Sequence, residues 1–202
     1  MDLMNAIRCV LLLSMLSAAT GCGYMSEHTY KQYLDANKGV FQFPYTGYEA
    51  HYYIAPQVRN LLGKVFYEPM GPDYQMAPVL FGSMLMDTLE SDDYQAAFYS
   101  LSETTEAALD EGLLFRYEEA RFEFKDYRAH ISLRIVATLD GQEILVRTFQ
   151  KDGPSQSVRN FITGHLGIAH SVEISTKWAL ERLLSDSLLK FQIEMDAEIW
   201  AE

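Results

Sequence analysis

The sequence predicts an α+β fold, with a mostly antiparallel sheet and two helices packed on one face. Apolar and polar residues alternate on both sides of Asp140-Gly141, a pair that strongly favours a β-hairpin because both turn positions need positive φ. Over 79–89 and 158–187, apolar residues instead recur every three or four positions, as on one face of a helix. The chain has 202 residues, 49% of them hydrophobic, which is enough for one sizeable core.

The first half of the chain predicts a short helix followed by a β–α–β unit. The short helix is expected over 26–37. A brief strand over 64–68 is ended by prolines and glycine, and the helix over 79–89 starts with Pro78 near its first turn, where the missing N–H is tolerated. Residues 96–100 predict the second strand of the unit, and a right-handed connection between the two strands is favoured.

The second half of the chain predicts strands and then a long helix. Two strand-like segments lie within 114–124, ahead of the hairpin. The last helix follows Gly153-Pro154, and glycines within 164–167 predict a break, so that the long helix begins near Ile168. Beyond it, apolar residues alternate over 191–195 and predict a final strand.

A two-residue turn fixes the register of the two hairpin strands. It places Ala137 opposite Ile144 on one face and Arg134 opposite Arg147 on the other. Like charges directly opposite each other are destabilising, so the second face is expected to be solvent-exposed or to hold a carboxylate between the arginines. Glu123, on a neighbouring strand, is the candidate counter-ion.

Residues 1–21 predict a cleaved signal peptide. The apolar run from Cys9 to Ala19 is shorter than the about 20 residues that span a bilayer, and it has the length of the apolar region of a secretory signal. Small residues follow the run and end at Cys22.

The tetrapeptide Ala19-Thr20-Gly21-Cys22 resembles the lipobox of bacterial lipoproteins, with Ala19 where that motif prefers leucine. The resemblance implies cleavage between Gly21 and Cys22, and a diacylglyceryl group and acyl chains such as palmitate on Cys22. Two or more acyl chains hold a protein stably at a bilayer. Gly23 resembles the class sorted to the outer membrane, so we expect lipid anchoring on its periplasmic face. The alternative is an ordinary cleaved signal with a chance cysteine.

Composition disfavours several kinds of partner and site. The net charge is −12, and an acidic chain is repelled by phosphates, so we expect no nucleic-acid partner. The two cysteines are Cys9, in the leader, and Cys22, at the expected anchor, which leaves no other thiol for a disulfide, a metal site or a nucleophile. His165 and His170 lie five residues apart, a spacing that does not aim both at one metal. We therefore expect no cofactor and no metal.

The serines and carboxylates of the sequence include two groups with the residue types that catalysis needs. Gly82-Ser83 lacks the Gly-x-Ser-x-Gly motif and lies inside the apolar helix, so it predicts a point of close packing. Glu118, Glu119 and Glu123 are close in sequence, but carboxylates on the surface of a strand are usually solvated. We expect no catalytic residues and no enzymatic activity.

The mature chain is predicted to divide into a tether over 22–60 and an α+β domain over 61–202. The tether is interrupted by prolines and glycines and is rich in aromatic residues. These side chains either pack onto the domain or form a partner surface, since aromatic residues are enriched in interface cores. The residues of the predicted partner surface are Phe41, Phe43, Tyr45, Tyr48, Tyr52 and Tyr53.

The order of the predicted elements resembles that of small envelope lipoproteins of Gram-negative bacteria, and above all the ABC-type transport auxiliary lipoprotein family. The similarity covers about residues 62–190. It rests on the helix over 79–89, Ile131-Ser132-Leu133, Asp140-Gly141, Val146-Arg147-Thr148-Phe149 and Leu180-Glu181-Arg182-Leu183-Leu184. YajG-type lipoproteins have a similar order.

The resemblance implies a lipid-anchored, periplasm-facing adaptor, a non-catalytic component of an envelope transport or assembly complex. One alternative is an accessory lipoprotein of peptidoglycan synthases or flagellar rings. Another is a lipid or acyl-chain carrier, which would need an apolar pocket of about 300 Å³ or more, lined by Phe81, Met84 and Ile135. A sheet edge without a partner strand is a further expected contact surface.

Overall fold

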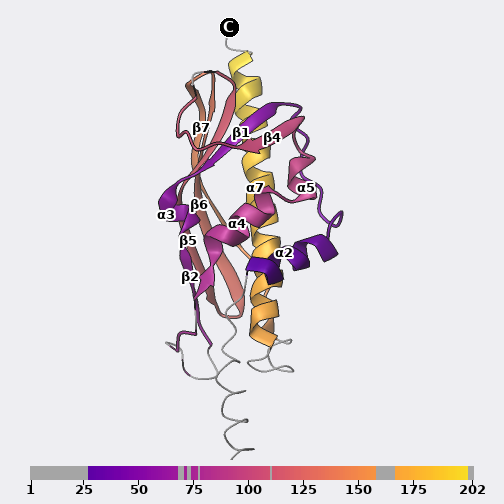
Figure 1. Ribbon diagram of the computed structural model, residues 1–202, viewed down its shortest axis with the longest axis vertical. Coiled ribbons are helices and arrows are strands. Elements are labelled where there is room, and N and C mark those ends of the chain that lie inside the picture. Colours follow the sequence, from indigo (N-terminus) through magenta and orange to yellow (C-terminus); the bar gives the residue numbers. More distant parts are fainter. Residues whose placement is uncertain are drawn as a thin grey trace, which may run out of the picture.

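The computed structural model describes residues 27–67, 71, 74–76, 78–109, 111–157 and 167–199, which form seven strands and five helices (Figure 1). The helices are α2 (Glu27–Ala36), α3 (Pro56–Arg59), α4 (Phe81–Leu89), α5 (Asp92–Gln95) and α7 (Ile168–Ile199). The strands are β1 (Glu49–Ile54), β2 (Leu62–Val65), β3 (Val79–Leu80), β4 (Ser100–Glu103), β5 (Leu113–Lys125), β6 (Arg128–Leu139) and β7 (Gln142–Asp152).

The strands form one mixed sheet centred on β5. On one side, β5 pairs antiparallel with β6, which pairs antiparallel with β7. On the other side, β5 pairs in parallel with β1 near its start and with β2 near its end. β4 lies parallel beside β1, and β3 lies antiparallel beside β2. The prediction of an α+β fold is confirmed, but that of a mostly antiparallel sheet is wrong, because helical connections let β1, β2 and β4 run in the same direction as β5.

The predicted β–α–β unit is correct in its helix and wrong in its second strand. α4 matches the predicted helix from residue 81 onward, whereas residues 79 and 80 form β3. Residues 97 and 98 lie in a buried turn after α5, and β4 begins at Ser100. β4 pairs with β1, whereas β2 pairs with β3 and β5, so the two strands of the predicted unit are not neighbours.

The predicted hairpin forms, with a register that differs from the expected one. Asp140 and Gly141 have φ of 49° and 79°, as the turn requires. A bulge after Ala137 then shifts the pairing, so that Ala137 lies opposite Leu145 and Arg134 opposite Thr148. The predicted Arg134–Arg147 and Ala137–Ile144 pairs are therefore wrong, and the bulge avoids the clash of like charges.

The counter-ion of Arg134 is also different from the predicted Glu123. β5 is one continuous strand with a bulge between Tyr117 and Glu119, and this bulge turns Glu118 toward Arg134. Nε of Arg134 donates to Oε2 of Glu118 over 3.1 Å.

The long helix α7 begins where it was predicted and continues further. It runs along the sheet, and α2, α4 and α5 lie on the same side of the sheet, so the helical layer is larger than the predicted pair (Figure 1). The final strand predicted over 191–195 is wrong. Leu188, Phe191 and Met195 are three and four residues apart and all buried, which is helical spacing that resembles alternation over a short stretch.

The sheet extends into the predicted tether, because β1 lies between β4 and β5. Tyr52 on β1 is 2% exposed, and Tyr30 on α2 is 1% exposed. The folded unit therefore begins upstream of the predicted boundary at residue 61, and α2 matches the short helix expected over 26–37.

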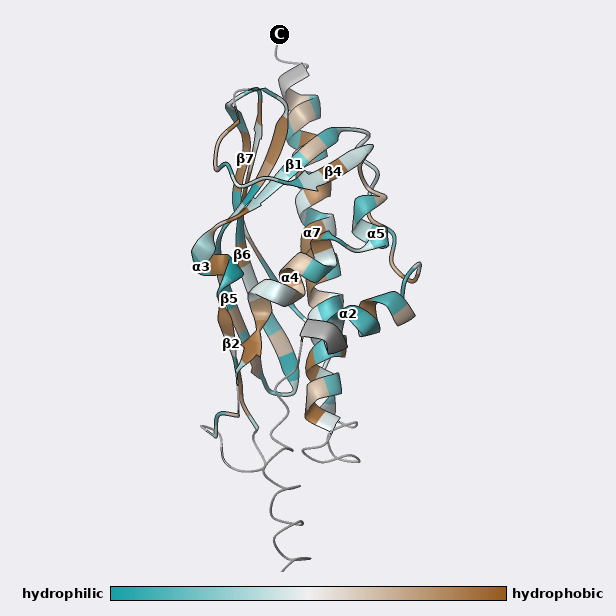
Figure 2. Cartoon of the chain, in the orientation of Figure 1, coloured by the Kyte–Doolittle hydropathy of each residue, from teal (hydrophilic) through white to brown (hydrophobic). Residues whose placement is uncertain are grey.

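The core lies between the sheet and α4 and α7, and it is rich in aromatic contacts. Figure 2 shows apolar stretches along the strands and along α7. The ring of Phe115 on β5 lies 5.3 Å from that of Phe191 on α7, and Phe122 stacks on Phe81 of α4 at 5.0 Å. An added Cβ at Gly82 would overlap backbone carbonyl groups of α3, which makes this glycine the close-packing point expected from the sequence.

Candidate functional site

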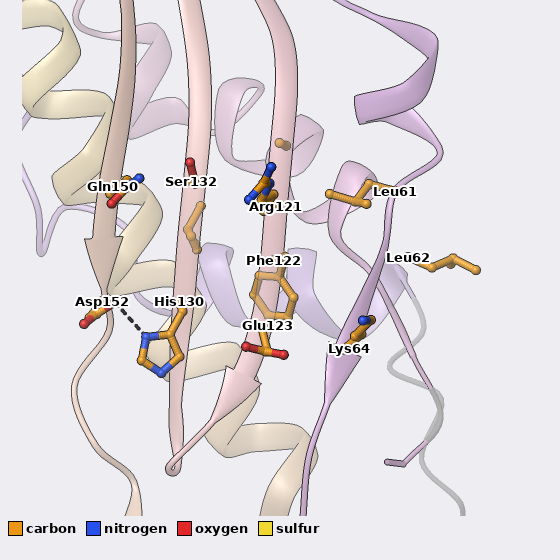
Figure 3. A pocket seen from close by; sticks show the side chains of 12 residues that line it. Leu61, Leu62, Lys64, Arg121, Phe122, Glu123, His130, Ser132, Gln150 and Asp152 are labelled. Carbon is orange, nitrogen blue, oxygen red and sulfur yellow. Dashed lines mark hydrogen bonds and ion pairs between the residues drawn. The ribbon is translucent and has the colours of Figure 1, made fainter. Parts of the chain in front are cut away.

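A hollow of about 540 Å³ opens on the face of the sheet that points away from α7 (Figure 3). It extends over β2, β5, β6 and β7, and its labelled side chains come from all four strands and from the residue before β2. Its lining mixes polar and apolar residues: Leu61, Leu62, Lys64, Ala120, Arg121, Phe122, Glu123, His130, Ile131, Ser132, Gln150 and Asp152.

A row of four charged or ionisable side chains crosses one end of the hollow. Strand register places Lys64, Glu123, His130 and Asp152 opposite one another on four consecutive strands. Nδ1 of His130 lies 2.8 Å from Oδ1 of Asp152, and Nε2 lies 3.3 Å from the carbonyl oxygen of Lys125. Both ring nitrogens are therefore engaged by protein atoms, which fixes the imidazole as part of the wall.

The next row contains uncharged polar groups around an arginine. Arg121, Ser132 and Gln150 lie opposite one another on β5, β6 and β7. Arg121 is exposed, and within the described residues no carboxylate lies within ion-pairing distance of its guanidinium. It also lines a second hollow of about 340 Å³, in which Glu119, Arg134 and Thr148 form the following row.

An ion-pair network closes the far end of this face. Glu118 accepts from Arg134, and its other oxygen lies 3.3 Å from Nε of Arg116. Arg116 also donates to Glu143 on β7 over 3.2 Å. One carboxylate thus stands between two arginines, and the network ties β5, β6 and β7 together.

The arrangement presents hydrogen-bonding groups that could bind a polar ligand. Arg121, Ser132 and Gln150 offer hydrogen-bond donors, and Glu119 and Glu123 offer acceptors, on a flat strand face. In the part of the chain that the structure describes, no three of the His, Cys, Asp and Glu residues gather as metal ligands. His165 lies outside the described residues, and His170 contacts Glu173 over 2.9 Å.

The three residues expected to line an apolar ligand pocket are part of the core. Phe81 and Ile135 are fully buried and Met84 is 3% exposed. All three belong to one continuous cluster of packed side chains, and neither hollow described above is lined by them. The hollows lie on the opposite, polar face of the sheet.

The predicted aromatic partner surface is divided between core and solvent. Tyr52 is buried, Phe43, Tyr48 and Tyr53 are half-buried against the core, Phe41 is half-buried, and Tyr45 is 61% exposed. The ring of Phe43 lies 5.0 Å from Tyr94, and that of Tyr48 lies 5.8 Å from Phe191. Phe41 and Tyr45 therefore stay available on the surface, whereas the others pack inward.

A second polar cluster is buried on α7 beneath α2. Lys177 and Glu181 form an ion pair one turn apart, both less than 10% exposed. Burial raises the pKa of the Glu181 carboxyl, against the lowering effect of Lys177. Burial likewise raises the pKa of Glu173, although His170 hydrogen bonds to it. Above this cluster, the buried Tyr30 hydroxyl of α2 contacts Oγ1 of Thr88 at 3.2 Å.

The residues of the polar hollow were not predicted as a site from the sequence. Lys64, Arg121, Ser132 and Gln150 lie on four strands, and they become neighbours through pairings that no local pattern specifies. The signal available in the sequence was the set of polar positions that alternate with apolar ones along each strand. Such positions indicate a solvent-exposed face of the sheet but do not indicate a hollow on it.

The predicted lipid-attachment residue Cys22 and the cleavage position Gly21 lie outside the described residues. α2 begins at Glu27, five positions after Cys22. No helix among the described residues is long and apolar enough to cross a bilayer.

Comparison with solved structures finds distant likenesses. The chain is similar to protein XCC0632 from Xanthomonas campestris, whose description assigns it to DUF330, with 11% sequence identity and a TM-score of 0.45. The match covers 76% of this chain and 91% of that chain. No protein-family model matches the sequence, and no curated protein matches it.

Proposed function

We propose that this chain is a lipid-anchored adaptor lipoprotein that faces the periplasm from the outer membrane. In this role it is a non-catalytic component of an envelope transport or assembly complex. The lipobox-like Ala19-Thr20-Gly21-Cys22 supports the anchor, and the net charge of −12 favours a protein partner over nucleic acid.

The observation that carries the proposal is the docking of α2. Four residues separate Cys22 from Glu27, so the extended chain between the two Cα atoms spans at most about 18 Å. α2 packs on α4 and α7 through Tyr30 and Leu34, which are 1% and 6% exposed. Acylation of Cys22 would therefore hold the whole folded unit close to the bilayer, with its surfaces free for partners.

Several surfaces of the folded unit suit a protein partner. The hollow over β2, β5, β6 and β7 contains hydrogen-bond donors and acceptors and side chains of both charges. These groups can pair with the backbone and the side chains of a bound polypeptide. β7 forms one edge of the sheet, pairing with β6 and with no second strand among the described residues. The packing of Phe81, Met84 and Ile135 into the core gives the acyl-carrier alternative no support.

The test is affinity purification of the full-length protein from detergent-solubilised envelopes, compared with Cys22→Ala. We expect the native protein to recover a defined set of transporter subunits. The variant should recover little of this set, because a domain without its anchor has a low effective concentration at the membrane. Recovery of cell-wall synthases or flagellar ring proteins would instead favour a different accessory role. Equal recovery by both proteins would contradict the requirement for the anchor.

A further inference from the structure

The outward side of α7 carries a stripe of exposed side chains that the packing of the core does not use. Trp178, Arg182, Leu189 and Ile193 lie within about 60° of one another around the helix and extend over about 22 Å. Trp178 is 42% exposed, Leu189 47% and Ile193 59%. We call these four residues, together with the adjacent Phe41 and Tyr45, the α7 stripe.

Arg182 is held between two aromatic rings at the centre of the α7 stripe. Its guanidinium carbon lies 5.3 Å from the ring centroid of Phe41 and 5.3 Å from that of Trp178. Stacking on ring faces leaves the N–H groups at the edge of a guanidinium free to bond a planar anion. The side chain is thus positioned in advance for a carboxylate.

The other charged side chains of α7 from His170 to Glu194 have partners. Lys177 pairs with Glu181, Lys190 with Glu194, His170 with Glu173, and Asp186 with Lys151 of β7. Within the described residues, Arg182 has no carboxylate within ion-pairing distance. The exposed guanidinium of Arg182 is therefore available to pair with an anion that a partner supplies.

The loop that carries Phe41 and Tyr45 is fixed beside the helix. Nε2 of Gln192 on α7 donates to the carbonyl oxygen of Tyr45 over 2.9 Å. The ring of Phe41 lies 5.0 Å from Phe43, which in turn lies 5.0 Å from the buried Tyr94. A surface held in this way loses little conformational entropy when a partner binds.

We propose that the α7 stripe binds an amphipathic helix of a partner protein that presents one carboxylate to Arg182 and apolar side chains to Trp178, Leu189 and Ile193. The proposal rests on the proposed adaptor function and names the chemistry of its partner. Tryptophan, tyrosine and arginine are the residues most enriched in binding hot spots, and the stripe is as long as about four helical turns.

Charge favours this occupant over two others. A second copy of this chain would bring together two bodies of net charge −12, and anionic lipid headgroups would meet the same repulsion. A single carboxylate set among apolar residues satisfies Arg182 without that cost. The occupant is therefore a partner helix with few charges.

The test selects random 16-residue peptides displayed on phage against the full-length protein immobilised in detergent. Selected peptides are then measured by fluorescence polarisation. We expect them to carry Asp or Glu three or four residues from Leu, Ile or Phe, the spacing of one helix face. Arg182→Glu should weaken binding about tenfold or more, and Arg182→Lys less, because lysine keeps the charge and loses the planar stack.

Lys31→Glu is the charge-reversal control, because Lys31 is likewise exposed and in no ion pair among the described residues, and it lies on α2, outside the α7 stripe and both hollows. It should leave peptide affinity unchanged, and circular dichroism should show that both charge-reversal variants are folded. The proposal is overturned if no peptides are enriched, if they lack an acidic residue, or if Arg182→Glu binds them as the native protein does.

Two further measurements separate the other occupants. Light scattering that shows a dimer lost in Arg182→Glu would assign the stripe to a second copy, and loss of binding to phosphatidylglycerol vesicles would assign it to lipid; either result overturns the proposal. Peptide binding needs no acyl group. If the α7 stripe binds peptides but Cys22 of the native protein carries no lipid, the proposed binding by the stripe is supported and the proposed anchored function is contradicted.

Discussion

Replacing Gly82 by alanine should destabilise the protein, although the same change inside an exposed helix would stabilise it. Gly82 lies in the first turn of α4, where the helix crosses α3. An ideal Cβ at this position would lie 2.6 Å from the carbonyl oxygen of Val58 and nearer still to that of Arg59, whereas ordinary contacts begin near 3.4 Å. These are backbone atoms, so α3 and α4 must separate by about 1 Å or more.

The magnitude follows from two opposing effects. Alanine is favoured over glycine by about 1 kcal/mol within a helix, and overpacking a close contact costs about 1–3 kcal/mol. Because the clash is with backbone, we take the upper end of the cost and expect a net loss of about 2 kcal/mol. For a chain of this size the loss lowers the melting temperature by about 4–8 °C.

The assay is urea unfolding of the full-length protein and of its Gly82→Ala variant, followed by circular dichroism. Gly82→Ser should be at least as destabilised as Gly82→Ala, since its side chain is larger. A Gly82→Ala variant about 1 kcal/mol more stable than the native protein would show that α3 and α4 are not in backbone contact, and would refute the reasoning.

Three further predictions concern α7 and its contacts. Phe191→Ala should lower stability by about 3–5 kcal/mol in denaturant unfolding, because the ring is fully buried between Phe115 and Tyr48; a loss below about 1 kcal/mol would contradict that packing. Tyr30→Phe should cost about 1 kcal/mol by the same assay, through loss of the hydroxyl contact with Thr88, and no change would contradict the docking of α2. Burial raises the pKa of Glu173 above its usual 4.5, so this carboxyl binds a proton more tightly in the native state than in the unfolded chain, and its contribution to stability falls as the pH rises above about 4.5. Glu173→Gln should make the fall shallower in unfolding curves measured from pH 4 to pH 7, and an unchanged slope would contradict the burial of this carboxyl.

Local chemistry was sufficient to predict some elements. The Asp140-Gly141 turn forms because its residues tolerate positive φ, whatever the rest of the chain does. α4 and the start of α7 follow from apolar spacing and from the glycines and prolines ahead of them. These signals depend on residues that are neighbours in the sequence, so they can be recognised without a structure.

Long-range pairing was not predictable in the same way. The parallel addition of β1 to β5 joins residues about sixty positions apart, and a polar, aromatic-rich segment gives no sign of it. The bulge after Ala137 shifts a register that turn geometry alone would set differently. At 191–195, alternation over five residues fits a strand and a helix equally, and the packing of Phe191 on Phe115 decides for the helix.

The candidate surfaces illustrate the same limit. Phe41 and Tyr45 were predicted as partner residues from their type, but Trp178 and Arg182 join them through packing of the loop on α7. The row from Lys64 to Asp152 is formed only by the pairing register of four strands, which the sequence does not specify locally.

The most direct test of the anchored function is the intact mass of the mature protein purified from cell envelopes. The account predicts a chain that begins at Cys22 and carries a diacylglyceryl group on its sulfur, with a further mass for any acyl chain on its amine. A mature chain with an unmodified N-terminus, or one that still contains residues 1–21, would contradict the anchor and with it the proposed adaptor role.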